Sequence, residues 1–257
     1  MEDNHFKITT NSKLFALGID ISEGVNVSKT DTLSVKLNNA NKTDCDIIAL
    51  YFNIIKIEDI ENSVQILKFL LPQISKPLMI CGSGKADIDR YLIPELIKTL
   101  DRECIISFAE ESTYKNIIPE VIKGNHYIVL KTPIDINLAK ELNILSTDLG
   151  LDKNKIIMNT DIGGLGYGYE YGYSIMEKVR LEGEKGDDYL KLPLLSEAAR
   201  ESLKTKEAKS ETLTAKGSIN TRAKMIELSA SAGVLSAGAN IIVMFYPENI
   251  SIMKGLI

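Results

Sequence analysis

The chain has 257 residues, which fits one (β/α)8 barrel of about 250 residues. Hydrophobic residues make up 44% and charged residues 25%, as in ordinary soluble globular proteins. The net charge of −5 argues against nucleic acid as a partner, because phosphate binding needs a basic face. No apolar run approaches the roughly 18 residues of a membrane span, and residues 1–7 lack the order of a signal peptide. We therefore expect a cytoplasmic protein that does not contact a membrane.

Strand and helix patterns alternate from about residue 32. Residues 1–31 form a lead-in before the first predicted barrel strand. Within this lead-in, we expect residues 14–19 to form a short strand that closes the bottom of the barrel. Near-continuous apolar runs typical of parallel strands buried on both faces predict eight strands. These strands are 32–37, 46–52, 77–81, 104–108, 127–131, 155–159, 189–194 and 240–245. Helical patterns lie at 59–71, 87–100, 112–123, 135–149, 168–185, 196–209 and 221–237. The sequence predicts one α/β domain over residues 1–257, a (β/α)8 TIM barrel; a doubly wound open sheet is the alternative.

The cysteines and histidines exclude several metal sites. Cys45, Cys81 and Cys104 each lie in or beside an apolar run without a C-x-x-C spacing, so we expect buried free thiols. An iron–sulfur cluster needs four thiolates, so this chain cannot hold one alone. The two histidines, His5 and His126, leave little imidazole for a zinc site or a Ser-His-Asp triad.

Barrel sites lie where the strands end and the following loops begin. The residues after the predicted strands are mostly neutral, polar or small, which favours a large polar ligand or a partner surface over acid–base catalysis. They are Asn38, Asn39, Asn53, Gly82, Ser83, Glu110, Glu111, Thr132, residues 160–164, Leu195, Ser196 and Tyr246.

Three motifs have an ordinary structural interpretation beside the functional one. Residues 81–86 look like a phosphate loop but have Met79 and Ala86 where the P-loop pattern requires Gly and Ser or Thr, so we favour a plain loop capped at Asp87. Glu110 and Glu111 could act as a base or as metal ligands, but we favour a capping role, because the helix dipole stabilises carboxylates in the first turn of the next helix. Lys131 could form a Schiff base or simply pair with a neighbouring acid.

Residues 161–180 are the most informative stretch. Five glycines and four tyrosines lie between residues 163 and 173, at a junction between a predicted strand and a predicted helix. Glycine removes side chains and relaxes the backbone, so such a junction lets something large approach the main chain. The alternative is a loop whose tyrosines pack the helix on the barrel. We favour a binding role for the glycines.

The same stretch carries a family resemblance. Residues 163–180, GGLGYGYEYGYSIMEKVR, closely resemble the G-G-L-G-Y-G-x-E-Y-x-Y-S-x-M-E-R-x-R motif of the corrinoid/iron–sulfur protein small subunit, the delta subunit of the acetyl-CoA decarbonylase/synthase complex. Residues 186–193 resemble its G-D-x-x-L-x-x-P segment, and residues 237–247 its A-G-A-D-I-x-V-M-R-H-P ending. The similarity runs in order over roughly residues 14 to 250.

The resemblance implies a TIM barrel paired with a larger subunit that carries a cobalamin domain and an iron–sulfur cluster. The barrel's C-terminal face would shelter the corrinoid, whose methyl group comes from a pterin through a separate methyltransferase and passes to acetyl-CoA synthase. We expect a non-catalytic subunit that binds no metal or cluster alone. The corrinoid-contacting candidates are Asn159, Thr160, Asp161, Gly163, Gly164, Gly166 and Tyr167, with Thr132 and Ser196 from neighbouring loops.

The chain departs from the family pattern at two places. Phe245-Tyr246 replaces Arg-His, and the family's tryptophan before the last helix is missing. Three alternatives stay open. They are a pterin-dependent methyltransferase in which Asn159 and Asp161 bind the pterin, a lyase that uses Lys131, and a structural subunit that has lost its corrinoid contact.

Overall fold

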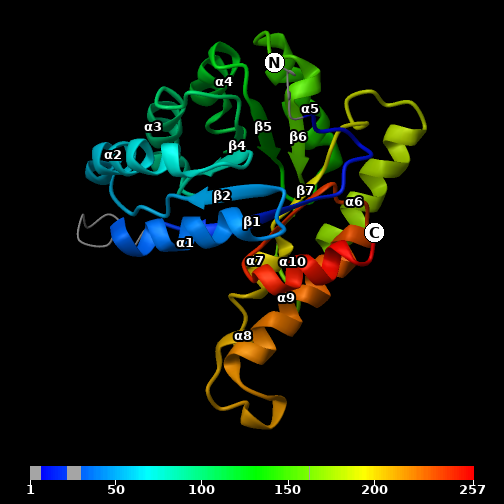
Figure 1. Cartoon of the computed structure of the whole chain (residues 1–257). Helices are drawn as coiled ribbons and strands as arrows, with labels where there is room; N and C mark the ends of the chain where they lie inside the picture. Colours follow the sequence, from blue (N-terminus) through cyan, green and yellow to red (C-terminus); the bar gives the residue numbers. More distant parts are fainter. Residues whose placement is uncertain (1–6, 22–29, 162) are drawn as a thin grey trace.

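The strands form a nearly closed barrel. The computed structural model describes residues 7–21, 30–161 and 163–257. Eight parallel strands lie in the order β6-β5-β4-β3-β2-β1-β8-β7, with helices outside them, which confirms the predicted TIM barrel (Figure 1). The ring closes between its end strands through one bridge, from Met158 to Leu194. Within the predicted lead-in, residues 1–6 and 22–29 lie outside the described residues.

Six predicted strands match the structure to within one residue at each end. The strands are β1 (Leu14–Asp20), β2 (Ile47–Tyr51), β3 (Leu78–Cys81), β4 (Ile105–Ala109), β5 (Tyr127–Lys131), β6 (Ile156–Asn159), β7 (Leu195–Ser196) and β8 (Ile241–Met244). The α-helices are α1 (Thr30–Lys42), α2 (Ile60–Leu70), α3 (Ala86–Ile97), α4 (Tyr114–Lys123), α5 (Ile136–Asp148), α6 (Tyr169–Glu184), α7 (Ala198–Ser202), α8 (Lys206–Lys209), α9 (Ile219–Ser236) and α10 (Pro247–Lys254). The helix predicted over 196–209 is thus two short helices, α7 and α8.

The predicted first strand was wrong. Residues 32–37 lie in helix α1, where Leu33, Leu37 and Ala40 are buried at the i, i+4, i+7 spacing of one helix face. The first barrel strand is β1, in the segment expected to close the bottom. The barrel therefore begins at Leu14 rather than near residue 32, because a short run containing Leu and Val also fits a helix.

The predicted seventh strand was also displaced. Leu190, Leu192 and Leu194 are buried in alternation, as in a strand, but the chain turns at residues 188–192. The Asp187 carboxylate accepts the Tyr189 N–H at 3.1 Å and holds this turn. Ladder pairing begins only at Leu195, so β7 has two residues.

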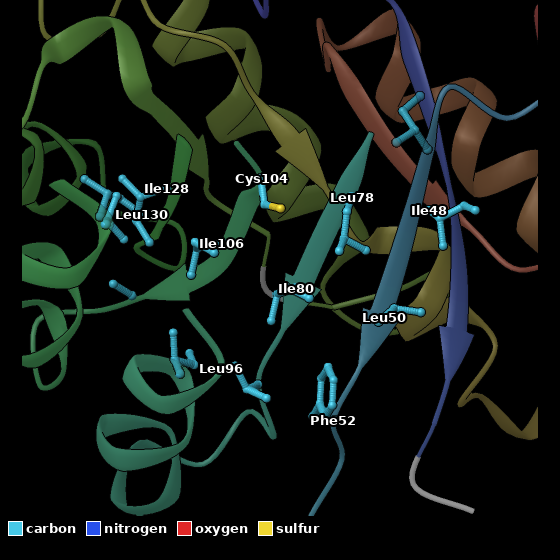
Figure 2. Packing of buried hydrophobic residues seen from close by; sticks show 14 of the residues in the cluster. Ile48, Leu50, Phe52, Leu78, Ile80, Leu96, Cys104, Ile106, Ile128 and Leu130 are labelled. Carbon is cyan, nitrogen blue, oxygen red and sulfur yellow. The ribbon is translucent and has the colours of Figure 1, made fainter. Parts of the chain in front are cut away.

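Two layers of apolar side chains follow from strand alternation. Ile48, Leu50, Ile80 and Ile106 point outward to the helices (Figure 2), in the larger cluster that also includes Leu96 of α3. The alternate residues of the same strands fill the barrel interior; among them are Ile47, Ala49, Tyr51, Met79, Cys81 and Ile105. The interior is therefore a packed core and not a pore.

Residues 8–12 close the N-terminal end of the barrel. Ile8 packs into the interior cluster, and its N–H donates to the Tyr127 hydroxyl at 3.4 Å. The Asn240 amide, just before β8, donates to the carbonyls of Thr10 and Ser12 at 2.7 and 2.9 Å. The closing role predicted for residues 14–19 thus belongs to the segment before them.

The α8 segment and the beginning of α9 extend away from the barrel (Figure 1). We call residues 203–222 the arm. Buried Arg222 donates to the carbonyls of Glu207 (2.9 Å) and Leu213 (3.1 Å), and also to those of Ser210 and Gly217. One guanidinium therefore organises the arm.

We expect Arg222→Met to loosen the arm and leave the barrel intact. The variant keeps the aliphatic stem but removes charge-assisted hydrogen bonds, each worth about 1.5–3 kcal/mol. Hydrogen exchange of amides 207–217 should accelerate by about tenfold, because local opening there no longer breaks those bonds. Lys216→Met, on the exposed surface of the arm, is the control. Equal acceleration in the barrel strands would contradict this account.

Candidate functional site

The carboxyl ends of the strands meet around one cluster of polar and charged side chains. The Tyr51 hydroxyl, at the end of β2, donates to Glu197 Oε1 at 2.7 Å. Lys131 Nζ, at the end of β5, lies 3.9 Å from Glu197 Oε2, and Arg200 Nη1 lies 3.7 Å from Oε1. Arg200 also stacks over the Tyr51 ring at 4.1 Å. We call Tyr51, Lys131, Glu197 and Arg200 the mouth cluster.

The mouth cluster corrects the expectation of a neutral cup. Glu197 and Arg200 follow β7, whose predicted position drew attention to Leu195 and Ser196 and away from these charges. The ion-pair interpretation of Lys131 is supported by its contact with Glu197. Its ammonium also lies 4.5 Å over the Phe108 ring, so both contacts face the barrel mouth.

Asp161 is the buried acid beside this cluster. Its Oδ2 accepts the Glu197 N–H, and its own N–H donates to Asn159 Oδ1 at 2.9 Å. Burial raises the pKa of Asp161 to about 7, more than the Glu197 N–H and the nearby Ser196 hydroxyl lower it. Its Oδ1 accepts no hydrogen bond among the described residues. This carboxyl therefore changes charge near neutral pH.

Other polar atoms at the same strand ends also lack partners within the described part of the chain. They are Thr132 Oγ1, Asn159 Nδ2 and Thr160 Oγ1. All three side chains are buried. A buried polar atom without a hydrogen bond costs about 1–3 kcal/mol, so a row of them at strand ends indicates a site.

The glycines near the mouth serve different purposes. A Cβ on Gly164 would lie 2.1 Å from Ser202 N in α7, and one on Gly163 would lie 2.1 Å from Tyr167 O. The fold itself therefore requires both glycines. Gly166 has a φ of +88° with open space at its Cβ position, and Tyr167 is 82% exposed. These two residues face outward.

All nine predicted site residues lie at the ends of three neighbouring strands or in the loops after them. Thr132 follows β5, Asn159 ends β6, the candidates from Thr160 to Tyr167 follow β6, and Ser196 ends β7. The buried Ser196 hydroxyl accepts the Ala198 N–H at 3.2 Å, which begins α7. Sequence reasoning missed Tyr51, Glu197 and Arg200. Had the predicted seventh strand ended one or two residues later, Glu197 would have been among the residues that follow a strand.

The loop that resembles a phosphate site is filled by the chain's own carboxylate. Asp89 accepts the N–H groups of Ser83 and Gly84 at 2.7 and 2.8 Å. The plain-loop interpretation is supported, although Asp89 and not Asp87 caps it. Glu110 accepts the Ser112 hydroxyl at 2.9 Å, and no hydrogen bond from the described α4 backbone reaches the carboxylates of Glu110 or Glu111. The expected capping of α4 by the carboxylates of Glu110 and Glu111 is therefore not found.

The other family-like motifs make contacts at the opposite end of the barrel, before β7 and β8. Gly238 has a φ of +104°, and its carbonyl accepts Arg180 Nε at 3.0 Å. Asn240 Oδ1 accepts the Leu194 N–H at 2.9 Å and joins β7 to β8. These contacts position strands, whereas Phe245, at the end of the second motif, follows β8 and packs on Tyr51 of the mouth cluster with the ring centroids 5.7 Å apart.

The family model for the CO dehydrogenase/acetyl-CoA synthase delta subunit matches residues 25–253. The chain belongs to this family. The resemblance carried by residues 161–180 is thereby confirmed.

Curated relatives are delta subunits of the acetyl-CoA decarbonylase/synthase complex. The protein of Methanocaldococcus jannaschii is 30% identical over 144 residues, 55% of this chain and 36% of the relative. Delta subunit 1 of Methanosarcina thermophila is 27% identical over 228 residues, 84% of this chain and 52% of the relative. The chain thus spans about half or less of the length of the relatives it matches.

Solved structures confirm the fold. Dihydropteroate synthase of Xanthomonas albilineans with 4-aminobenzoic acid superposes with a TM-score of 0.65 at 11% identity, covering 97% of this chain and 95% of that one. A Yersinia pestis dihydropteroate synthase with a sulfonamide drug complex gives 0.63 at 12% identity, covering 100% and 98%. This likeness shows the barrel alone.

The described residues confirm buried free thiols at Cys45, Cys81 and Cys104. Across the same residues, no helix is long and apolar enough to span a bilayer. Nor do they gather three or more His, Cys, Asp or Glu side chains that could hold a metal ion.

Proposed function

We propose that the chain is the barrel subunit of a cytoplasmic corrinoid/iron–sulfur methyl carrier, and that its C-terminal face covers the cobalamin held by a larger subunit. The observation that supports this most is the mouth cluster. Tyr51, Lys131, Glu197 and Arg200 fill the barrel opening with mutually paired side chains. A broad, flat ligand would therefore lie on this face and not inside it.

The candidate residues fit that role in two groups. Gly166 and Tyr167 are open to the outside, so they would contact the corrinoid rim directly. Gly163 and Gly164 would hold that loop against α7, while Asn159, Thr160, Asp161, Thr132 and Ser196 would support it from below. Bound corrinoid supplies the methyl-carrying cobalt; methyltransferase and acetyl-CoA synthase would be transient partners. This chain orients and shelters the cofactor without catalysing the transfer.

The test is anaerobic co-purification with the larger subunit, followed by visible spectroscopy. We expect a complex with corrinoid and iron–sulfur absorbance. Tyr167→Ala should preserve the complex but let added imidazole reach the corrinoid severalfold faster, because an exposed ring is removed from the cover. Lys185→Ala, at the far end of α6, is the control. A lone, colourless chain would refute the proposal, and unchanged imidazole access would refute the role of Tyr167.

A second candidate rests on two atoms. Among the described residues, Asn159 Nδ2 and Asp161 Oδ1 are an unpartnered donor and acceptor two residues apart at one strand end. Such a pair could bind the amide and amine edge of a pterin in a methyltransferase barrel. The fold also resembles dihydropteroate synthases, one of which was solved with pteroic acid. Calorimetric titration of the isolated chain with methyltetrahydrofolate, with Asn159→Ala as the comparison, decides this candidate.

A further inference from the structure

A groove lies at the rim of the barrel, between the loop before α4 and the first three turns of α5. Its volume is about 450 Å³. Helices α3 and α4 pack together, as do α5 and α6, but α4 and α5 make few contacts, and β5 is visible between them (Figure 1). The ring of helices is therefore interrupted at this place.

The floor of the groove is apolar. Leu138, Leu142 and Leu145 lie at the i, i+4, i+7 spacing and present one face of α5 to it. Leu138 is 44% exposed, although it lies on a helix face that would normally be covered by a neighbouring helix. Thr132 also lines the groove; this side chain is buried, and its Oγ1 has no partner among the described residues.

The walls of the groove are acidic. Glu110 and Glu111 lie on one side and Glu141 on the other. No cation among the described residues pairs with Glu111 or Glu141, and the single lysine in the lining, Lys131, has its charge directed at Glu197. Unpaired carboxylates above a leucine floor are complementary to a cation carried on an apolar body.

We propose that this groove docks a basic, partly apolar segment of the larger subunit, with a Lys or Arg between the acidic walls and an aliphatic residue on Leu138. The assignment rests on the proposed function, because it names where that subunit attaches. Leucine and carboxylate groups together favour a protein segment, since a free metal cation would not use the apolar floor.

The test compares binding of the purified larger subunit to the wild-type chain and to three variants of it. E111K/E141K should weaken binding by at least about tenfold, because both walls then repel a cation. Leu138→Glu should weaken it similarly, and this side chain is exposed enough to change without unfolding. The control, Asp148→Lys, makes a single acid-to-lysine reversal at the exposed far end of α5 and should bind normally. Thermal melting checks that every variant is folded.

The outcomes separate this inference from the proposed function. If the wild-type chain binds the larger subunit and the groove variants bind equally well, the groove is not the docking site, while the carrier proposal stands. If the wild-type chain does not bind at all, both fail. A third arm titrates arginine methyl ester and follows the melting temperature. A shift that Glu141→Lys abolishes, with subunit binding unchanged, would make this a small-cation site and overturn the inference.

Discussion

Gly164→Val is expected to destabilise the chain by about 3 kcal/mol, since a side chain at this position meets backbone and not a flexible tip. Its Cβ would lie 2.1 Å from Ser202 N, 2.4 Å from Ser202 Cα and 2.5 Å from the Glu201 carbonyl carbon. Helix α7 would have to move, and α7 carries Arg200 of the mouth cluster. Urea unfolding measures the loss of free energy.

Gly166→Asn is the matched control two residues away. Its Cβ would meet nothing within 4 Å, and asparagine tolerates the positive φ of 88° better than other side chains do. The cost should stay below about 1 kcal/mol. Equal destabilisation by the two variants would show that loop conformation, and not packing against α7, makes Gly164 necessary.

Asp161→Asn is expected to flatten the pH dependence of stability. In the folded chain the pKa of Asp161 is about 7, compared with an ordinary value of 3.8. The folded state therefore binds more protons than the unfolded state between these values. This difference in proton binding stabilises the folded state at low pH, and the stabilisation is lost as the pH rises through about 7. It contributes about 4 kcal/mol at most to the free energy of unfolding.

The measurement is urea unfolding of both proteins near pH 5 and near pH 8. Asparagine can still accept the Glu197 N–H without a buried charge, so the variant should gain stability relative to the wild type as pH rises. Burial also raises the pKa of Glu227 to about 7, which adds the same slope to both proteins and cancels in their difference. Parallel curves for the two proteins would contradict the assignment to Asp161.

The fold could be predicted because its strands are buried on both faces. Six such runs were placed to within one residue, because short, nearly continuous apolar runs between longer helical patterns are typical of parallel strands. The failures occurred where this signal was weak. In residues 32–37 two leucines four residues apart satisfy a helix as well as a strand, and β7 is too short to show a period.

The candidate site could be predicted only in part for the same reason. Asn159 ends a strand that was placed correctly and the other candidates up to Tyr167 follow it, so their position at the mouth was expected. Glu197 and Arg200 follow a strand that was misplaced, and Tyr51 ends a strand whose other residues are apolar. The contacts of Tyr51 and Lys131 with Glu197 depend on tertiary geometry, which local spacing does not encode.

The barrel has a seam, and the seam ends at the functional face. Between β6 and β7 the hydrogen bonding reduces to the Met158 bridge, with its N–H on the Pro193 carbonyl at 2.8 Å. Closer to the mouth, the hydrogen bond from the Glu197 N–H to the Asp161 carboxylate joins the segments that follow β6 and β7. Titration of Asp161 or displacement of Glu197 by a partner would act on the weakest joint of the ring. A change in the charge of Asp161 or in the position of Glu197 would therefore alter the contact between β6 and β7.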